Sequence, residues 1–413
     1  MSHPVHANRS IVARLAVGLV SVGCSNGPVV LGWNATDASL SSSLDGPPDA
    51  PPDDSGSFDG SPDAPPDDSG SFDGSPDAPP DDSGSFDGSP DAPTMDSGNI
   101  TAPSCLTGGP GSTNCGGGSE SCCTSLPVAG GTFNRTYTNT GNGATGLADP
   151  ATVSDFRLDK YLVTVGRFRR FVAAWTAGWR PVAGSGKHTH LNGGKGLATM
   201  GGANERGWMA ADTPNVSPTS TNLACTGTLY PDLAAGSHYD TWTPSAGSQE
   251  NLPITCANWY EAYAFCIWDG GFLPSEAEFV YAAAGGNEQR QYPWGSANPG
   301  VGYQYAVYAC YFPSLSGTCT GVANVAPVGT AALGAGKWGH VELAGSLWEW
   351  NLDWSGPYVN PCVDCANLTT GSVRSTQGGN FNTGTSAFPP LRHPDNPADT
   401  GAYAYGMRCA RTP

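Results

Sequence analysis

The sequence predicts an α+β domain with short strands, few helices and long disulfide-pinned loops, placed after a disordered amino-terminal stalk. Three helix-like patterns, an even set of cysteines in the last 310 or so residues and a run of Asp/Pro-rich repeats before them support this prediction. The rest of the carboxyl-terminal part is rich in Gly, Pro, Asn, Trp and Tyr, and few segments alternate as strands do. Its length is ample for one large core or two small ones.

The negative charge of the chain is concentrated in one segment. Fifteen aspartates and no Lys or Arg lie between Asp45 and Gly98, whereas residues 99–413 hold 20 acidic and 16 basic residues. The net charge of −18 therefore describes a tail and not a folded surface. Nucleic acid is disfavoured as a partner. No apolar run reaches the roughly 18 residues that a membrane-spanning helix needs.

Residues 1–24 have the features of a signal peptide. Arg9 and Arg14 precede a short apolar run, residues 15–23, which ends at Cys24. We interpret Cys24 as a lipidation site, where several acyl chains would anchor the protein firmly to a membrane. This predicts a lipoprotein of the cell envelope or outer membrane. The alternative is plain secretion after cleavage nearby.

Residues 25–98 read as a disordered stalk. They contain three identical copies of PPDDSGSFDGSPDA, at 51–64, 65–78 and 79–92. Each copy carries a single large apolar side chain, so stacked copies could bury too little surface to offset the entropy of ordering. Calcium binding by the aspartates is disfavoured, because no Gly-turn loop with spaced ligands is present.

The cysteines predict a disulfide framework. Without Cys24, twelve of the thirteen remain. They are Cys105, Cys115, Cys122, Cys123, Cys225, Cys256, Cys266, Cys310, Cys319, Cys362, Cys365 and Cys409. Spacing alone leaves their pairing open. We treat residues 99–126 as a Cys-rich segment that joins the stalk to a domain spanning 127–413.

The one CxxC motif, CVDC at 362–365, predicts a local structural disulfide. A zinc site would need a second such pair, and a thioredoxin-like motif would need a strand-to-helix setting.

Three segments show helical spacing. The first begins at Thr164, places Phe168, Phe171 and Trp175 on one face, and ends at Gly178. The second runs from Trp259 to the glycines at 270–271. The third opens with Ser275 and Glu278, a capping box, and ends at the glycines at 285–286.

Common catalytic motifs are absent: the sequence contains no G-x-x-x-x-G-K-[ST], H-E-x-x-H or G-x-S-x-G. His188 and His190, in KHTH, have strand spacing and would need a third donor to hold a metal, so we interpret them as part of a solvated loop. The twelve tryptophans fit either a core or a carbohydrate- or peptide-binding surface.

Glu342, Gly345, Leu347 and Glu349 surround a turn in GHVELAGSLWEWNLDW. Two carboxylates with intervening carbonyls suit calcium, which takes six to eight oxygen ligands. The alternative is that Trp348 and Trp350 pack inward while Glu349 accepts backbone hydrogen bonds.

A family resemblance covers residues 133–411. The segments ITCANWYEAYAFCIWDGGFLPSEAEFVYAAAGG, YPWG, APVGT, LAGSLWEW, GGNF and GMRCAR follow one another in the order seen in the formylglycine-generating-enzyme, or sulfatase-modifying-factor, family. FRLDKYLVTVGRF resembles its opening strand and first helix. The resemblance implies a variant of the C-type-lectin fold.

True members convert a sulfatase cysteine to formylglycine with copper(I) held by two cysteines between the landmarks that match GGNF and GMRC. Here the corresponding segment, residues 382–405, contains no cysteine. Without thiolates there is no soft site for copper(I), so we predict neither copper binding nor formylglycine-generating activity.

The resemblance also transfers individual residues. It implies a bond between Cys266 and Cys409, and it matches a calcium site to Glu342, Gly345, Leu347 and Glu349, although Asn or Asp is usual at the first position. A second calcium site of the family lacks its Asn here. Three departures remove polar partners, as expected of a divergent copy. They are Leu162 for an acid, Phe272 for Arg and Ser346 for Asn.

These features predict an exported, lipid-anchored protein whose domain binds a protein, peptide or glycan ligand or serves a structural role. The rival hypothesis is a non-heme iron or other metal-dependent oxidoreductase, since relatives of this fold perform iron-dependent sulfoxide synthesis. The iron ligands of those relatives lie in a helical domain that is absent here. A site in this chain would have to use His188, His190 or His393.

Overall fold

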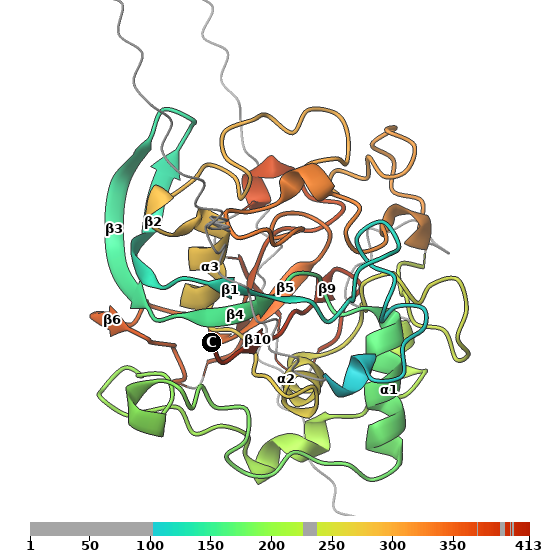
Figure 1. The fold of residues 1–413 in the computed structure, drawn as a ribbon, viewed down its shortest axis with the longest axis horizontal. Helices are drawn as coiled ribbons and strands as arrows, with labels where there is room; N and C mark the ends of the chain where they lie inside the picture. The colour runs from blue at the N-terminus through green and yellow to red at the C-terminus, as the bar shows by residue number, and fades with distance from the viewer. Residues whose placement is uncertain (1–101, 226–237, 370, 389–392, 397, 399) are drawn as a thin grey trace, which may run out of the picture. The chain divides into compact units, whose positions relative to one another are not determined.

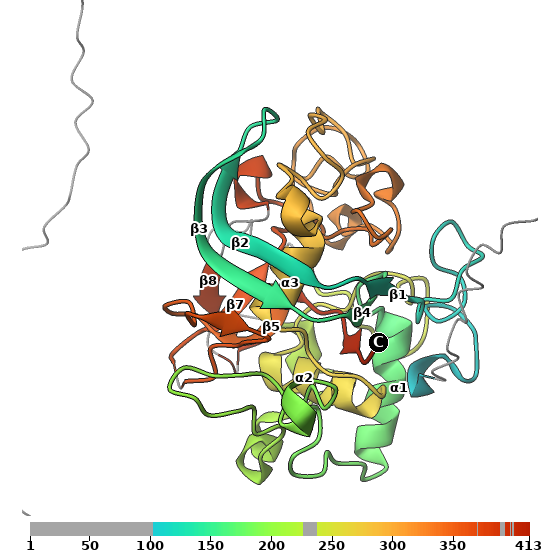
Figure 2. The same ribbon diagram turned by 60° about the vertical axis from the view of Figure 1, so that its left-hand side comes forward.

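The computed structural model describes residues 102–225, 238–369, 371–388, 393–396, 398 and 400–413. The described residues form three α-helices, several short 3-10 helices and three small sheets, joined by long loops (Figures 1 and 2). This agrees with the predicted α+β class. The predicted signal peptide, Cys24 and the predicted stalk at 25–98 lie outside the described residues. Within the described residues, no helix is long and apolar enough to cross a membrane.

The three predicted helices are confirmed, and local capping explains where each begins. α1 spans Val165–Thr176 and α2 spans Trp259–Trp268. α3 spans Glu276–Ala284, and Ser275 and Glu278 form the expected capping box at its start. The side chain at each N-cap accepts a hydrogen bond from the backbone three residues later, so each first turn has a satisfied amide.

The strands form three small sheets. The first has the order β1-β4-β10, with bounds Ser125–Val128, Phe156–Asp159 and Ala410–Arg411. The second has the order β2-β3-β6, with bounds Gly131–Asn139, Ala144–Val153 and Cys362–Val363. The third has the order β8-β7-β5-β9, with bounds His393–Asn396, Arg374–Gln377, Trp348–Trp354 and Tyr405–Gly406. In the first sheet β4 lies between strands from the two ends of the domain, which brings those ends together.

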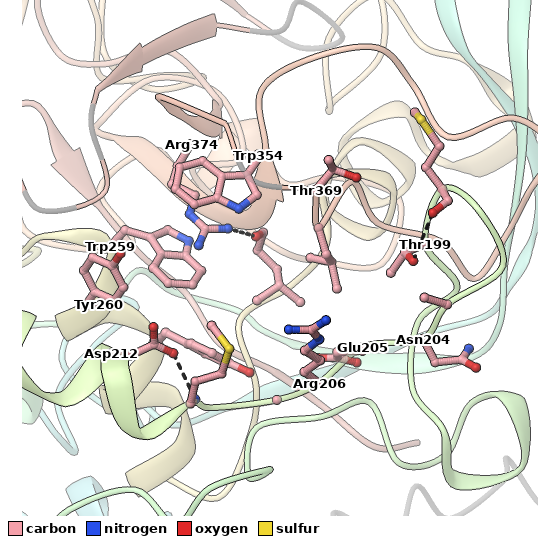
Figure 3. A pocket seen from close by; sticks show the side chains of 17 residues that line it. Thr199, Asn204, Glu205, Arg206, Asp212, Trp259, Tyr260, Trp354, Thr369 and Arg374 are labelled. Atoms are coloured by element: carbon pink, nitrogen blue, oxygen red, sulfur yellow. Dashed lines mark hydrogen bonds between the residues drawn. The ribbon is translucent and has the colours of Figure 1, made fainter.

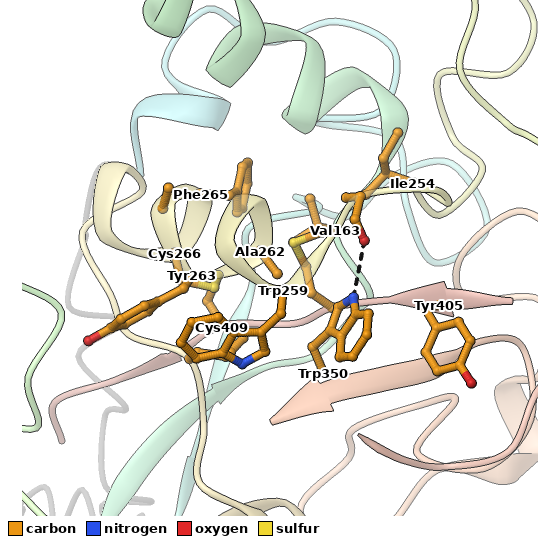
Figure 4. Packing of buried hydrophobic residues seen from close by; sticks show 14 of the residues in the cluster. Val163, Ile254, Trp259, Ala262, Tyr263, Phe265, Cys266, Trp350, Tyr405 and Cys409 are labelled. Carbon is orange, nitrogen blue, oxygen red and sulfur yellow. Dashed lines mark hydrogen bonds between the residues drawn. A yellow bond between two sulfur atoms is a disulfide. The ribbon is translucent and has the colours of Figure 1, made fainter. Parts of the chain in front are cut away.

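The largest buried hydrophobic cluster includes residues of α1, α2 and the third sheet (Figure 4). Trp350 is fully buried, stacks on Tyr405 with ring centroids 5.0 Å apart, and donates a hydrogen bond from Nε1 to the Ala257 carbonyl at 3.1 Å. Phe265, on α2, stacks on Phe168 of α1, and their ring centroids are 5.7 Å apart. Because the indole N–H of Trp350 has an acceptor, this large side chain is buried without leaving a hydrogen-bond donor unpaired.

The Cys-rich segment packs directly on the domain. Two disulfides, Cys105–Cys123 and Cys115–Cys122, close it, and its Ser104 amide donates to the Asp269 carboxylate at 3.0 Å. On α1, Arg167 donates to the Ser104 hydroxyl at 3.0 Å and to the Cys122 carbonyl at 3.0 Å. The described part of this segment is thus held by the same side chains that anchor α1.

The disulfide between Cys266 and Cys409 joins α2 to the loop before β10, across 143 residues of sequence. We expect the double substitution C266A/C409A to lower the free energy of unfolding by about 2–5 kcal/mol, because the bond restricts a long loop in the unfolded chain. The matched control is C362A/C365A, whose bond closes a loop of 3 residues and should matter less. Urea unfolding of the three proteins measures both effects. An equal loss in the two variants would contradict this prediction.

Candidate functional site

All twelve cysteines from Cys105 to Cys409 are paired in six disulfides. The local bond predicted between Cys362 and Cys365 is confirmed. The pair Cys266–Cys409, which the resemblance implies, is also present. The described residues therefore contain no thiol, and the donor set does not fit copper(I), which requires soft sulfur ligands.

A cavity of about 540 Å³ lies beside the start of α2 (Figure 3). One side is formed by residues 199–212, a loop segment that precedes α2. The other sides come from the first turns of α2, from β5, and from Leu368, Thr369 and Arg374. Aromatic and apolar side chains make up much of its lining. They are Met200, Met209, Trp259, Tyr260, Tyr263, Leu352, Trp354 and Leu368.

Arg374 is placed in this cavity by strand pairing. It is the first residue of β7 and lies directly opposite Trp354 of β5. Its guanidinium carbon is 3.5 Å from the Trp354 ring centroid and 3.4 Å from that of Trp259, so the planar cation is held between two indoles. Trp259 is itself fixed by a 2.8 Å hydrogen bond from Nε1 to the Asn351 carbonyl.

Arg374 is 7% exposed, and its guanidinium is only partly hydrogen-bonded. Nη1 donates to the Leu352 carbonyl at 2.7 Å, whereas Nε is buried without a partner among the described residues. Burial lowers the pKa of Arg374 to about 9, although nearby Asp212 and Asp353 oppose this shift, and the group remains charged at neutral pH. Among the described residues, Arg374 forms no ion pair.

Three further charged residues line the cavity: Glu205, Arg206 and Asp212. Asp212 is 8% exposed and accepts the Met209 amide at 2.9 Å, and burial raises its pKa. Arg206 is exposed and belongs to the same loop segment (Figure 3). The cavity therefore combines a buried cation, an exposed cation and two carboxyl groups, those of Glu205 and Asp212, on largely apolar walls.

His188 is fully buried, so the solvated loop predicted for KHTH is wrong at this residue. Its Nδ1 lies 3.0 Å from Glu205 Oε2 and its Nε2 lies 3.1 Å from Glu278 Oε2. Burial would lower its pKa, but the two carboxylates outweigh burial and raise the pKa to about 10. The same contacts hold the pKa values of Glu205 and Glu278 below their usual range despite burial. His188 is therefore a buried imidazolium, and both its ring nitrogens are occupied by carboxylates.

The other histidines considered as metal ligands do not join it. His190 lies with its ring centroid 6.2 Å from that of His188, and its two ring nitrogens are buried without partners among the described residues. His393 begins β8, and its side chain lies outside the described part of the chain. Among the side chains that are described, no group of three or more His, Cys, Asp or Glu is arranged to share a metal ion.

The four residues matched to a calcium site do lie together around one turn. Glu342 is buried with φ of 59°, and its Oε1 accepts the Gly329 amide at 2.8 Å. Its Oε2 is buried without a partner among the described residues, and burial raises the pKa of Glu342 to about 7. Glu349 is different, because Arg408 donates to both its carboxylate oxygens at 2.7 Å. Gly345 and Leu347 lie between them on the turn before β5.

The model of the sulfatase-modifying factor enzyme 1-like domain family matches residues 117–413. The chain belongs to this family. Within the sulfatase-modifying-factor family, the formylglycine-generating enzyme of Streptomyces coelicolor is 32% identical over 168 residues, which is 39% of this chain and 52% of that enzyme. The inactive C-alpha-formylglycine-generating enzyme 2 of Bos taurus is 30% identical over 169 residues, or 40% of this chain and 53% of that protein. The chain thus spans about half the length of the curated relatives it matches.

Among solved structures, PvdO from Pseudomonas aeruginosa aligns with a TM-score of 0.41 and 17% identity, covering 70% of this chain and 94% of PvdO. The family match agrees with the sulfatase-modifying-factor domain that the sequence predicted.

Sequence reasoning did not find the Arg374 cavity or the partners of His188. The residues around Arg374 come from four separate stretches between 199 and 374, and no local motif joins them. The abundance of tryptophan was the one signal in the sequence that pointed to an aromatic binding site.

We expect His188 to make the free energy of unfolding decrease as the pH rises into the alkaline range. Because its pKa is about 10 in the fold and about 6.5 when unfolded, its contribution is complete below pH 6.5 and is lost as pH rises through 10. We expect His188→Gln to lower the free energy of unfolding near pH 6.5 by about 3–5 kcal/mol, because two buried carboxylates lose their cation. The variant should also lose most of the decline between pH 6.5 and 10. Urea unfolding across this range tests both effects.

The control is His340→Gln. His340 is also fully buried, but burial lowers its pKa to about 3, so it is neutral throughout this range. Its variant should keep the alkaline decline of the unaltered protein. An alkaline decline that persists in His188→Gln would show that His188 is not its source.

Proposed function

We propose that this protein is exported and lipid-anchored through Cys24, and that its sulfatase-modifying-factor domain is a binding module that does not generate formylglycine. The observation that carries the proposal is the complete pairing of the twelve cysteines after residue 100. A domain without a free thiol lacks the ligands that copper(I) needs and cannot supply a thiolate to the reaction.

Two further observations support a binding role. One similar protein, from Bos taurus, carries the name of an inactive formylglycine-generating enzyme, so the family contains members described as lacking the activity. The cavity beside Arg374 offers aromatic walls and a cation without an ion pair among the described residues, which are features of ligand sites. The leader and stalk, as read from the sequence, would hold such a module away from a membrane.

The proposal predicts no formylglycine production. The full chain, incubated aerobically with copper(I) and a sulfatase-derived peptide that contains the target cysteine, should leave the peptide thiol unchanged by mass spectrometry. An active formylglycine-generating enzyme assayed in parallel provides the positive control. A copper-dependent aldehyde peak from this protein would overturn the proposal.

We also propose a calcium ion at the turn before β5. The buried and unpartnered Oε2 of Glu342 is the observation that favours it, because such an oxygen is a ready ligand for a hard cation. Glu342 would supply the charge, and Gly345 and Leu347 would add oxygens. Glu349 is already neutralised by Arg408, so it would contribute only its remaining lone pairs. The bound ion would supply charge that stabilises the turn.

The calcium proposal predicts a specific pH dependence. Because the pKa of Glu342 is raised to about 7, the calcium-free fold should lose stability as pH rises from about 4.5 through 7. Calcium binds the ionised form, so millimolar CaCl₂ should raise Tm more at pH 8 than at pH 5.5. Glu342→Gln should abolish both effects. Glu288→Gln, at a carboxylate whose side chain is 42% exposed, is the matched control and should respond like the unaltered protein. A calcium shift that survives Glu342→Gln would refute this site.

A further inference from the structure

The edge of the Arg374 guanidinium is the most unusual polar feature among the described residues. Both faces of the group are covered by indole rings, and Nη1 is used by the Leu352 carbonyl. What is left is the edge formed by Nε and Nη2, for which the described residues provide no hydrogen-bond acceptor. A cation buried to this extent without an acceptor for Nε is costly, because the desolvated N–H loses its bond to water.

The geometry of the Nε–Nη2 edge indicates which kind of acceptor group it would bind. Two parallel N–H groups in one plane match the two oxygens of a carboxylate, which Arg binds in a bidentate manner. The tryptophan faces prevent approach from above or below the plane. A planar acceptor that enters edge-on therefore fits better than a bulky tetrahedral one.

The volume and lining of the rest of the cavity indicate what kind of ligand body would fit. Its volume of about 540 Å³ lies within the usual range for small-ligand sites. Met209, Tyr260 and Leu368 add apolar and aromatic surface to its lining. Asp212 and Arg206 stand on the other side in Figure 3, where Asp212 can accept an N–H or O–H group. A charged head with an apolar or aromatic body matches this arrangement.

We propose that the cavity binds a ligand that carries a carboxylate on an apolar body, with the carboxylate held by the Nε–Nη2 edge of Arg374 between Trp259 and Trp354. The ligand is either a free hydrophobic acid or the carboxyl terminus of a peptide, since both present the same group. This inference rests on the proposed binding function and names the class of ligand for it.

The test compares acids with their neutral amides on the full chain. The probes are 3-phenylpropanoate with 3-phenylpropanamide, and acetyl-Gly-Gly-Phe with its carboxamide, measured by calorimetry and saturation-transfer NMR at pH 7. At least one acid should bind at least about tenfold more tightly than its amide, because the charge-assisted pair is lost in the amide. A preference for the peptide or for the small acid identifies the source. If neither acid exceeds its amide, the inference is wrong.

Variants separate recognition from structure. Arg374→Lys keeps the charge but loses the planar edge, and should weaken acid binding at least about tenfold with little effect on the amide. Thr369→Trp fills the cavity from an exposed position and should abolish binding even if the Arg374 variant fails to fold. Arg180→Gln is the matched control, because Arg180 also stacks on an indole, 3.9 Å from the Trp175 ring centroid, but lies outside the cavity.

The outcomes also separate this inference from the function on which it rests. A protein that neither binds acids nor makes formylglycine would overturn only the ligand class. Formylglycine production would overturn the binding-module function whatever the cavity binds. Acid binding that persists unchanged in both Arg374→Lys and Thr369→Trp would place the ligand elsewhere and refute the site.

Discussion

The fold depends on a buried quartet of charges: Asp159, Arg167, Asp269 and Arg411. All four side chains are at most 1% exposed, and the arginine-to-carboxylate distances are 2.6–3.1 Å. Each carboxylate contacts both arginines, so no charge is left without its opposite. Because they come from β4, α1, the end of α2 and β10, these residues fasten the two ends of the domain to each other. Burying charge is costly, but removing any one member would leave an uncompensated ion and cost about 3–5 kcal/mol.

The sequence predicted the parts of the fold that local chemistry determines. The helix starts at Thr164 and Ser275 could be read directly, because capping involves residues three apart. The quartet could not be predicted, since its members are separated by up to 252 residues. Disulfide pairing divides in the same way: the Cys362–Cys365 bond is local, whereas Cys266–Cys409 was implied only by family resemblance.

In the candidate sites, too, local motifs could be read from the sequence but long-range contacts could not. The turn with Glu342 and Glu349 was visible as a motif, but Arg408, which neutralises Glu349, lies 59 residues away from it in sequence. His188 was expected in solvent because a Lys-His-Thr-His segment is polar, yet Glu205 and Glu278 make its burial possible. Arg374 carries no sequence signal, since its role arises from strand pairing with Trp354 and from the distant start of α2. Tertiary contacts therefore determine the surroundings of each of these residues.

One departure from the family pattern lies beside a buried ion pair that reaches the Arg374 cavity. Phe272 stands where the resemblance places an arginine, and the ring of His188 packs 3.8 Å from it. The cation in contact with Phe272 is thus an imidazolium, held between Glu278 of α3 and Glu205. Glu205 belongs to the loop that forms one wall of the Arg374 cavity. That wall is fastened to α3 through an ion pair whose cation, with a pKa of about 10, is charged at neutral pH. A buried ion pair of His188 with Glu205 and Glu278 therefore links this wall of the cavity to α3.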